Sequence, residues 1–359
     1  MKQTSTPLVS VHCATYNHGA FIREALESFV NQKTNFPFRV IVGDDHSRDN
    51  TAQIIQEYAE SYPEIIVPIY QPKNQGGRLN SIEIYRACGA SKYLAFCEGD
   101  DFWTDPQKLQ KQVDFLEEHP DYSICFHRVR EFYDHAPQEN HISPTDRQIC
   151  KILSEGGFCS RTILNNYYLR LNSLMVRRLY KEGIIDYPSP PNIINGDVYL
   201  SFMYSLRGKI GFIDQVMSAY RIHSSGIWSG LKDEYQMYSQ YGIAMLNCYQ
   251  ALESASPASL KTEARTAVNY HFRRMQAHLI WNSDFPLLRQ LQQHFPDAYQ
   301  YNLRYCLIGT ITKNSIHSER KTDIFNYYRE FGLVKLLKKL LLTCWIQIKF
   351  YYYRLYYHH

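Results

Sequence analysis

Short apolar runs alternate with helix-like segments over the amino-terminal third of the chain, and this alternation constrains the fold more than any other feature. The runs at residues 8–14, 38–42, 65–70 and 93–97 have the length of buried strands. Between them, apolar positions recur at helical spacing, as in residues 21–30. Strands separated by helices of this length form βαβ units. The sequence therefore predicts an α/β domain with a mostly parallel central sheet flanked by helices.

The regular alternation fades after the fourth strand. A helix is expected after Pro106, and the polar residues 134–160 are expected to form an irregular insertion. Another helix opens at residues 195–197, and another strand spans residues 211–221. Beyond about residue 230 helical segments dominate. We therefore expect an α/β domain at residues 1–230, a helical region at residues 231–331 and a separate tail at residues 332–359.

Composition excludes several classes of protein. The net charge is only +4 over 359 residues, which argues against a dedicated nucleic-acid binder. The nine cysteines show no C-x-x-C spacing, and residues 1–7 lack the apolar core of a signal peptide. Reduced thiols in the cytoplasm are the simplest interpretation. No apolar run is long enough to span a bilayer.

Three carboxylates surround one glycine directly after the fourth strand, in Glu98-Gly99-Asp100-Asp101. Each raises the pKa of its neighbours unless a cation lies between them. Oxygen ligands without a nearby cysteine or histidine favour Mg2+ or Mn2+. Open α/β sheets bind their ligands at the carboxyl ends of strands, where this cluster is expected. The alternative is an acidic turn that only caps the helix after Pro106.

Further polar patches follow other predicted elements. Thr15-Tyr16-Asn17 ends the first strand, and Asp44-Asp45-His46-Ser47 follows the second. A tyrosine ring can stack on a flat base, and a carboxylate can accept a hydrogen bond from a uracil N–H. Asp197 opens a helix and His223 follows a strand. Taken singly, the acids can be helix N-caps and the histidine an ordinary turn residue.

Together these motifs resemble the inverting family 2 glycosyltransferases, which have the Rossmann-like GT-A fold. The resemblance covers residues 7–230 and implies that residues 1–230 form a GT-A nucleotide-sugar-binding and catalytic domain. The matching motifs are Thr15-Tyr16-Asn17, Asp44-Asp45-His46-Ser47, Glu98-Gly99-Asp100-Asp101, Asn195-Gly196-Asp197 and Tyr220-Arg221-Ile222-His223.

The resemblance implies a role for each matching residue on the nucleotide side. Tyr16 stacks against the base, and Asp45, with Asp44, hydrogen-bonds the uracil ring. Arg78 lies where the family often places a basic nucleotide contact. Glu98 stands at the first position of the family's D-x-D motif and contacts the ribose or a metal-bound water. Thr15, Asn17 and Gly99 complete the nucleotide-binding set.

The resemblance also implies the metal ligands and the base. Asp100 holds Mn2+ or Mg2+, with Asp101 as a second-rank ligand. His223 is an additional metal ligand or a pyrophosphate contact, and Asp197 is the general base. The glutamate at position 98, where aspartate is commonest, leaves the ribose contact open.

The implied reaction is transfer of a single hexosyl or N-acetylhexosaminyl group. The donor is a UDP-sugar, and the acceptor is a hydroxyl of a saccharide, of the polyprenyl-diphosphate-linked kind used in O-antigen, lipopolysaccharide or capsule synthesis. None of the four tryptophans follows an arginine, so the Q-x-x-R-W signature of processive synthases is missing. The alternatives are a sugar-1-phosphate nucleotidyltransferase, which would want a glycine-rich basic loop near residues 15–19, and a non-catalytic membrane-tethered scaffold.

The tail at residues 332–359 carries five Lys or Arg and no acid, together with Trp345 and several tyrosines. On a helix, Lys335, Lys338 and Lys339 share one stripe while the leucines lie largely elsewhere. This pattern indicates a helix in a membrane interface. We therefore expect a peripheral protein on the inner face of the cytoplasmic membrane. The alternative is a helix that packs on the protein itself or on another subunit.

Overall fold

The computed structural model describes residues 6–133, 137–178 and 190–302. The chain forms two compact units. One comprises Met1–Pro191 and Asn195–Gly230, and the other comprises Asn192–Ile194 and Leu231–His359. The tail at residues 332–359, with its predicted membrane helix, lies outside the described residues.

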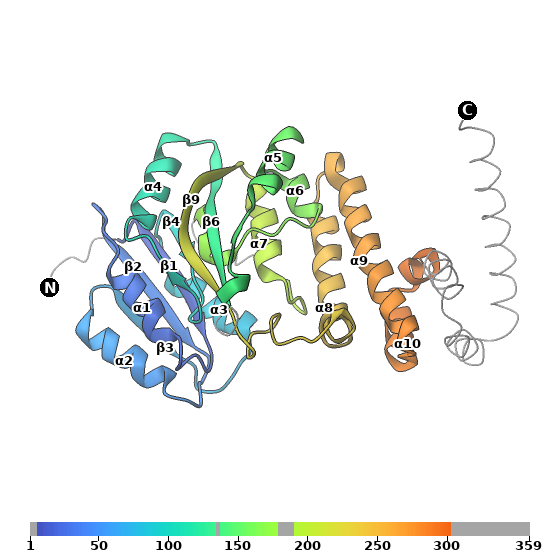
Figure 1. The fold of residues 1–359 in the computed structure, drawn as a ribbon, viewed down its shortest axis with the longest axis horizontal. Coiled ribbons are helices and arrows are strands. Elements are labelled where there is room, and N and C mark those ends of the chain that lie inside the picture. Colours follow the sequence, from blue (N-terminus) through green and yellow to red (C-terminus); the bar gives the residue numbers. More distant parts are fainter. Residues whose placement is uncertain (1–5, 134–136, 179–189, 303–359) are drawn as a thin grey trace, which may run out of the picture. The chain divides into compact units, whose positions relative to one another are not determined.

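The first unit is built on a nine-stranded sheet, which confirms the α/β prediction (Figure 1). Eight strands follow the order β3-β2-β1-β4-β8-β6-β9-β5, and β7 pairs with β6. β1 pairs in parallel with β2 and β4, and β2 with β3, as expected of βαβ units. The strands are β1 (Val9–Thr15), β2 (Phe38–Asp44), β3 (Ile66–Tyr70), β4 (Tyr93–Phe96), β5 (Phe102–Trp103), β6 (Tyr122–Tyr133), β7 (His141–Ser143), β8 (Met175–Arg177) and β9 (Lys209–Ile222).

Alternation along β1 assigns helices to the two faces of the sheet. Val9, Val11 and Cys13 are fully buried in one apolar cluster with residues of α1, α2 and α4. The intervening Ser10 and His12 face α3: Ser10 Oγ donates to Cys88 O, and His12 Nε2 to Ser81 O, both at 3.0 Å. The α-helices of this unit are α1 (Ile22–Val30), α2 (Thr51–Ser61), α3 (Gly77–Ala87), α4 (Lys108–Glu118), α5 (Asp146–Ser154), α6 (Ser160–Leu164) and α7 (Gly196–Ser205).

The second half of the sheet differs from the sequence prediction. β6 has 12 residues and pairs in parallel with β9, yet polar residues such as Arg128 and Glu131 hide its strand pattern. From residue 137 onward, the segment predicted to be an irregular insertion is more regular than expected. Its helix α5 begins with a capping box, in which the side chains of Thr145 and Gln148 each bond the other residue's backbone N–H.

The second unit is helical where it is described, as predicted. Leu246 of α8, Phe272 and Leu279 of α9, and Leu288 of α10 belong to one buried apolar cluster. The elements are α8 (Glu234–Ala255), a 3-10 turn (Ala258–Leu260), α9 (Lys261–Trp281) and α10 (Phe285–His294). None of the helices in the described part of the chain is long and apolar enough to cross a membrane.

A lysine lies fully buried in the first unit. Lys108 Nζ donates to Gln112 Oε1 at 2.7 Å and lies 4.3 Å from the centre of the Trp103 ring. Loss of hydration lowers the pKa of this amine to about 7. An unfolded lysine keeps its proton up to about pH 10.4. Between these two values the unfolded state therefore binds a proton that the folded state has released, so stability rises with pH.

We predict that Lys108→Met flattens the rise in stability between about pH 7 and pH 10, because it removes this difference in proton binding. Urea midpoints measured across that range check the prediction. Lys111→Met, a partly exposed lysine on the same helix, serves as the matched control and should keep the wild-type slope. An unchanged slope in Lys108→Met would contradict the assignment.

Candidate active site

The predicted functional motifs meet at one edge of the sheet. β1, β2 and β4 run in the same direction, and β6 matches them because it is antiparallel to β8, which is antiparallel to β4. β9 is parallel to β6. The carboxyl ends of β1, β2, β4 and β9 therefore lie on the same side, where open sheets bind ligands.

Hydrogen bonds join the turns that follow β1 and β2. Asp44 accepts from the backbone N–H of Ser47 at 3.1 Å and from its hydroxyl. Ser47 Oγ accepts from Asn17 N at 2.8 Å, and Asn17 Oδ1 accepts from Arg48 N at 2.8 Å. These bonds hold the two predicted motifs side by side. Tyr16, half-buried, lies between Thr15 and Asn17 at the end of β1.

Asp45 is buried and holds the loop before α3. Its Oδ1 accepts from Gln75 N and its Oδ2 from Gly76 N, both at 2.8 Å. Each oxygen keeps a second lone pair that can accept a further bond. Arg78, in the first turn of α3, donates from Nε to the carbonyl of Pro190 at 3.1 Å. Both residues thus also have structural partners, which the sequence did not predict.

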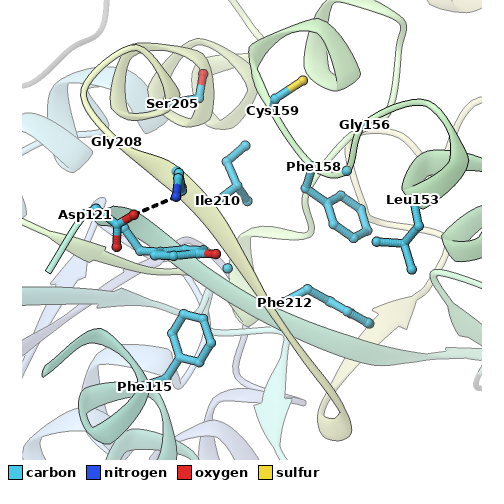
Figure 2. A pocket seen from close by; sticks show the side chains of 14 residues that line it. Phe115, Asp121, Leu153, Gly156, Phe158, Cys159, Ser205, Gly208, Ile210 and Phe212 are labelled. Carbon is cyan, nitrogen blue, oxygen red and sulfur yellow. Dashed lines mark ion pairs between the residues drawn. The ribbon is translucent and has the colours of Figure 1, made fainter. Parts of the chain in front are cut away.

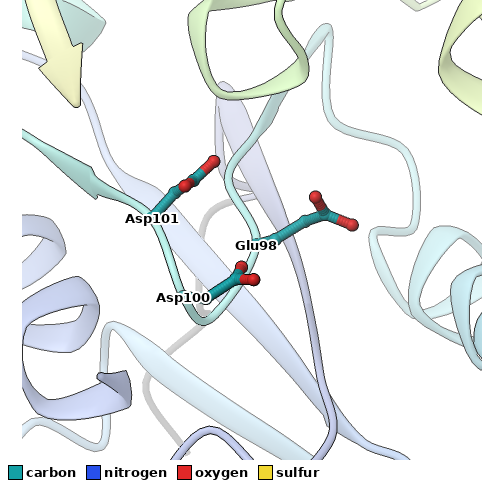
Figure 3. A group of neighbouring side chains, drawn as sticks. All are labelled: Glu98, Asp100 and Asp101. Atoms are coloured by element: carbon teal, nitrogen blue, oxygen red, sulfur yellow. The ribbon is translucent and has the colours of Figure 1, made fainter. Parts of the chain in front are cut away.

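The acidic turn after β4 is drawn in against β1. Gly99 N donates to Ala14 O at 3.0 Å. Ligand atoms of Glu98, Asp100 and Asp101 lie within 4.8 Å of one another, and Figure 3 shows the three side chains projecting from one turn. Glu98 is exposed, Asp100 half-buried and Asp101 buried. The structure therefore brings together the three carboxylates in which the sequence predicted a metal site.

Asp100 is the centre of this cluster. Its Oδ2 lies 3.2 Å from His223 Nε2 and 3.7 Å from His18 Nε2. Burial alone would raise the pKa of Asp100, but the His223 hydrogen bond and the nearby His18 lower it overall. Burial lowers the pKa of His18, against the opposing effect of Asp100. Among the described residues, no group donates a hydrogen bond to the buried Asp100 Oδ1. A buried carboxylate oxygen without a donor fits a cation ligand.

The other two carboxyls of the turn have raised pKa values. Asp101 Oδ1 accepts from Arg221 N at 2.9 Å, yet burial and the charge of Asp100 raise the pKa of Asp101 well above its usual value. Loss of hydration at the Glu98 carboxyl raises its pKa, and the charges of Asp100 and Asp197 raise it further. A divalent cation would favour the ionised form of all three turn carboxylates.

Asp197 lies in the first turn of α7, two residues after the N-cap Asn195. Its charge acts on Glu98, which places it on the same side of the sheet as the acidic turn. Loss of hydration raises the pKa of Asp197, although its own backbone N–H, that of Val198 and the cation Arg170 oppose the rise. A carboxyl whose pKa moves toward neutrality is suited to accept a proton.

Three further residues lie near the acidic turn or Asp197, and the sequence analysis assigned a role to none of them. His18 directly follows the Thr-Tyr-Asn motif, so its position beside Asp100 could have been suspected. Arg170 forms a two-pronged bond to Glu131 Oε1, at 2.6 Å and 3.0 Å, and lies 4.6 Å from the Tyr220 ring centre. Arg221 donates to Asp100 O at 3.1 Å. Nothing in the sequence around Arg170 signals its position.

A pocket of about 750 Å3 lies at the other edge of the sheet (Figure 2). It is lined at the amino ends of β6 and β9 by aromatic side chains that include Phe158 and Phe212. The ion pair between Asp121 and Lys209, at 2.8 Å, borders it. Because these strands run away from the pocket toward the acidic turn, the pocket is separate from the candidate active site.

Comparisons with known proteins concern the family and the fold. The sequence matches the family described as glycosyl transferase family 2 over residues 10–183. An uncharacterised protein of Mycobacterium tuberculosis is 36% identical over 245 residues, which is 68% of this chain and 67% of that protein. TuaG of Bacillus subtilis, named for teichuronic acid biosynthesis, is 35% identical over 113 residues, or 31% of this chain and 43% of TuaG.

A solved structure has a similar fold. It is a mannosyltransferase from Pyrobaculum calidifontis in complex with GDP-mannose and Mn2+. The TM-score is 0.55 at 14% sequence identity, and the match covers 95% of this chain and 88% of that one. At this identity the likeness concerns the fold.

We predict that Gly99→Ala destabilises the protein by about 1–3 kcal/mol, because the new methyl group overpacks the site. A Cβ there would lie 2.6 Å from Thr15 Oγ1 and 2.8 Å from Ile22 Cδ1. Gly77→Ala, at a position with open space, is the matched control and should change stability by less than about 0.5 kcal/mol. Urea unfolding of both variants makes the comparison, and equal stabilities would refute the close approach.

Proposed function

This chain belongs to glycosyl transferase family 2, and we propose that it transfers a single sugar from a UDP-sugar to a hydroxyl of a saccharide acceptor, with inversion. It is a glycosyltransferase of the GT-A fold. The observation that carries the proposal is the acidic turn. A buried Asp100 oxygen at the carboxyl edge of the sheet accepts no hydrogen bond from the described residues, and the charge of Asp197 raises the pKa of Glu98 in the same turn.

Residues 1–230 would form the donor-binding and catalytic domain. Tyr16 would stack on the base, with Asp44 and Asp45 at the uracil ring, where each Asp45 oxygen still has a lone pair to offer. Glu98 would contact the ribose, and Arg78 would contact the nucleotide. The backbone of the motif that contains Thr15, Asn17 and Gly99 would shape the nucleotide site.

Asp100, with Asp101 and His223, would hold Mn2+ or Mg2+. A ligand set made mostly of carboxylate oxygens fits such an ion, as does the buried Asp100 oxygen, which accepts no hydrogen bond from the described residues. When bound, the ion supplies Lewis-acid stabilisation of the departing nucleoside diphosphate. His18 lies near the same Asp100 oxygen, and its protonated form favours the ionised carboxylate.

Asp197 would accept the proton of the acceptor hydroxyl as that oxygen attacks the anomeric carbon. Its raised pKa favours proton capture, and its place in the first turn of α7 fixes its backbone. One base on the face opposite the leaving group gives a single displacement, which inverts the anomeric centre. No covalent enzyme intermediate is then required.

Family membership favours glycosyl transfer over the nucleotidyltransferase alternative. A non-catalytic scaffold would retain the fold but would not turn over a UDP-sugar. We further propose that the acceptor belongs to surface-polysaccharide synthesis and is linked to a polyprenyl diphosphate. The name of TuaG supports the polysaccharide part of this proposal.

We predict different defects for two variants, measured as UDP release from UDP-sugars with Mn2+ and as UDP binding. Asp197→Asn should lower turnover by about 10²–10⁴-fold while UDP still binds, because only proton transfer is lost. Asp100→Ala should abolish the Mn2+-dependent part of UDP binding, measured by calorimetry with and without chelator. Asp214→Asn, an exposed acid on β9, is the control and should match the wild type.

A different outcome would contradict each of these assignments. Full turnover in Asp197→Asn would remove the base assignment. Unaltered Mn2+-dependent binding in Asp100→Ala would remove the ligand assignment. A wild-type protein that releases no UDP from any UDP-sugar would favour the scaffold.

We also propose that the tail at residues 332–359 attaches the enzyme to the inner surface of the cytoplasmic membrane. Its five basic residues would contribute about 1 kcal/mol each near an anionic leaflet. Deleting residues 332–359 should therefore abolish sedimentation with phosphatidylglycerol vesicles. Replacing Lys335, Lys338 and Lys339 by Gln should weaken it while the apolar stripe remains. Binding that survives the deletion would overturn this proposal.

A further inference from the structure

Arg221 contacts the backbone of the acidic turn without facing solvent. It lies at the end of β9, and 7% of its side chain is exposed. Its Nε donates to Asp100 O at 3.1 Å, and its backbone N–H donates to Asp101 Oδ1 at 2.9 Å. The guanidinium also forms an ion pair with Glu24 of α1. One residue thus binds two members of the turn and links both to the first helix.

Three phenylalanine rings surround the Arg221 guanidinium. Its central carbon lies 4.9 Å from the ring centre of Phe21, 5.5 Å from that of Phe102 and 4.9 Å from that of Phe132. These rings come from the residue before α1, from β5 and from β6. A planar, weakly hydrated guanidinium stacks well on such rings. The cage restricts the side chain to the orientation in which Nε reaches Asp100 O.

The same strand end brings His223 to the Asp100 carboxylate. Its Nε2 lies 3.2 Å from Asp100 Oδ2, and its ring centre lies 4.6 Å from that of Phe21. Phe21 therefore contacts both Arg221 and His223. Residues that orient metal ligands without touching the metal strongly affect its binding. Their mutation typically lowers metal affinity or activity by 10- to 100-fold.

We propose that Arg221 is a positioning residue that holds the main chain of Asp100 and the carboxylate of Asp101 in the arrangement that binds the divalent ion. This inference rests on the proposed function, in which these two acids are ligands. Arg221 acts through the turn and touches neither ion nor substrate. A lysine could supply the charge, but it lacks the planar guanidinium that fills the space between the rings and donates to Asp100 O and to Glu24 from two different nitrogens.

The test measures Mn2+ binding by electron paramagnetic resonance of free Mn2+, with UDP present and without turnover. Arg221→Lys should raise the Mn2+ concentration for half-saturation about 10-fold or more. Glu24→Gln, at a half-exposed position that folding should tolerate, should raise it less, in the same direction. Arg128→Lys is the matched control. Arg128 of β6 also forms an ion pair with a residue of β9. Its register partner Val216, however, lies five residues before Arg221 along β9, away from the strand end that contacts the acidic turn.

A rise in Arg221→Lys and Glu24→Gln, with Arg128→Lys at the wild-type value, supports the inference. Wild-type affinity in Arg221→Lys overturns it, and so does an equal rise in Arg128→Lys. If Arg221→Lys does not fold, wild-type affinity in Glu24→Gln overturns it. A wild-type protein without Mn2+ binding removes the metal site and this inference together. If the variants change Mn2+ binding as expected but the wild-type protein releases no UDP, the inference stands and the proposed reaction is rejected.

Discussion

Electrostatic repulsion within the acidic turn is the constraint on which this site depends. Three carboxylates on residues 98–101 come within 4.8 Å of one another, and such a group is stable only where donors and cations surround it. Two histidines approach one oxygen of Asp100, and a backbone N–H binds Asp101. The other oxygen of Asp100 is buried without a donor in the described structure. Hydrogen-bond partners thus reach part of the turn, and the remaining Asp100 oxygen fits the cation that we propose for this site.

The sheet supplies these partners from distant parts of the chain. Arg221 and His223 lie more than 100 residues after the turn, yet both bind it. Parallel pairing of β6 with β9 makes this possible, because β6 runs in the direction of β4. A reversal of β9 would have placed its last residues at the opposite edge, beside the aromatic pocket.

The structure agrees best with the sequence prediction for polar residues that directly follow a strand. Asp44, Asp45 and the acidic turn come directly after apolar runs, so their meeting at one edge could be predicted. β6 was missed because polar residues such as Arg128 and Glu131 occupy the strand, each neutralised by an ion pair that the sequence does not reveal. Arg170 was missed for the same reason, since its partner Glu131 is almost 40 residues away.

By itself, the sequence determined the alternating α/β architecture, the order of the motifs and the placement of carboxylates after strands, because strand and helix periodicity and turn chemistry are local properties. Only the tertiary structure decided which groups oppose the charges of the acidic turn. It also decided that Asp45 binds the loop before α3 and that Arg221 occupies a cage of three rings. These contacts join residues 30 or more positions apart and depend on strand order and direction, so no local pattern encodes them.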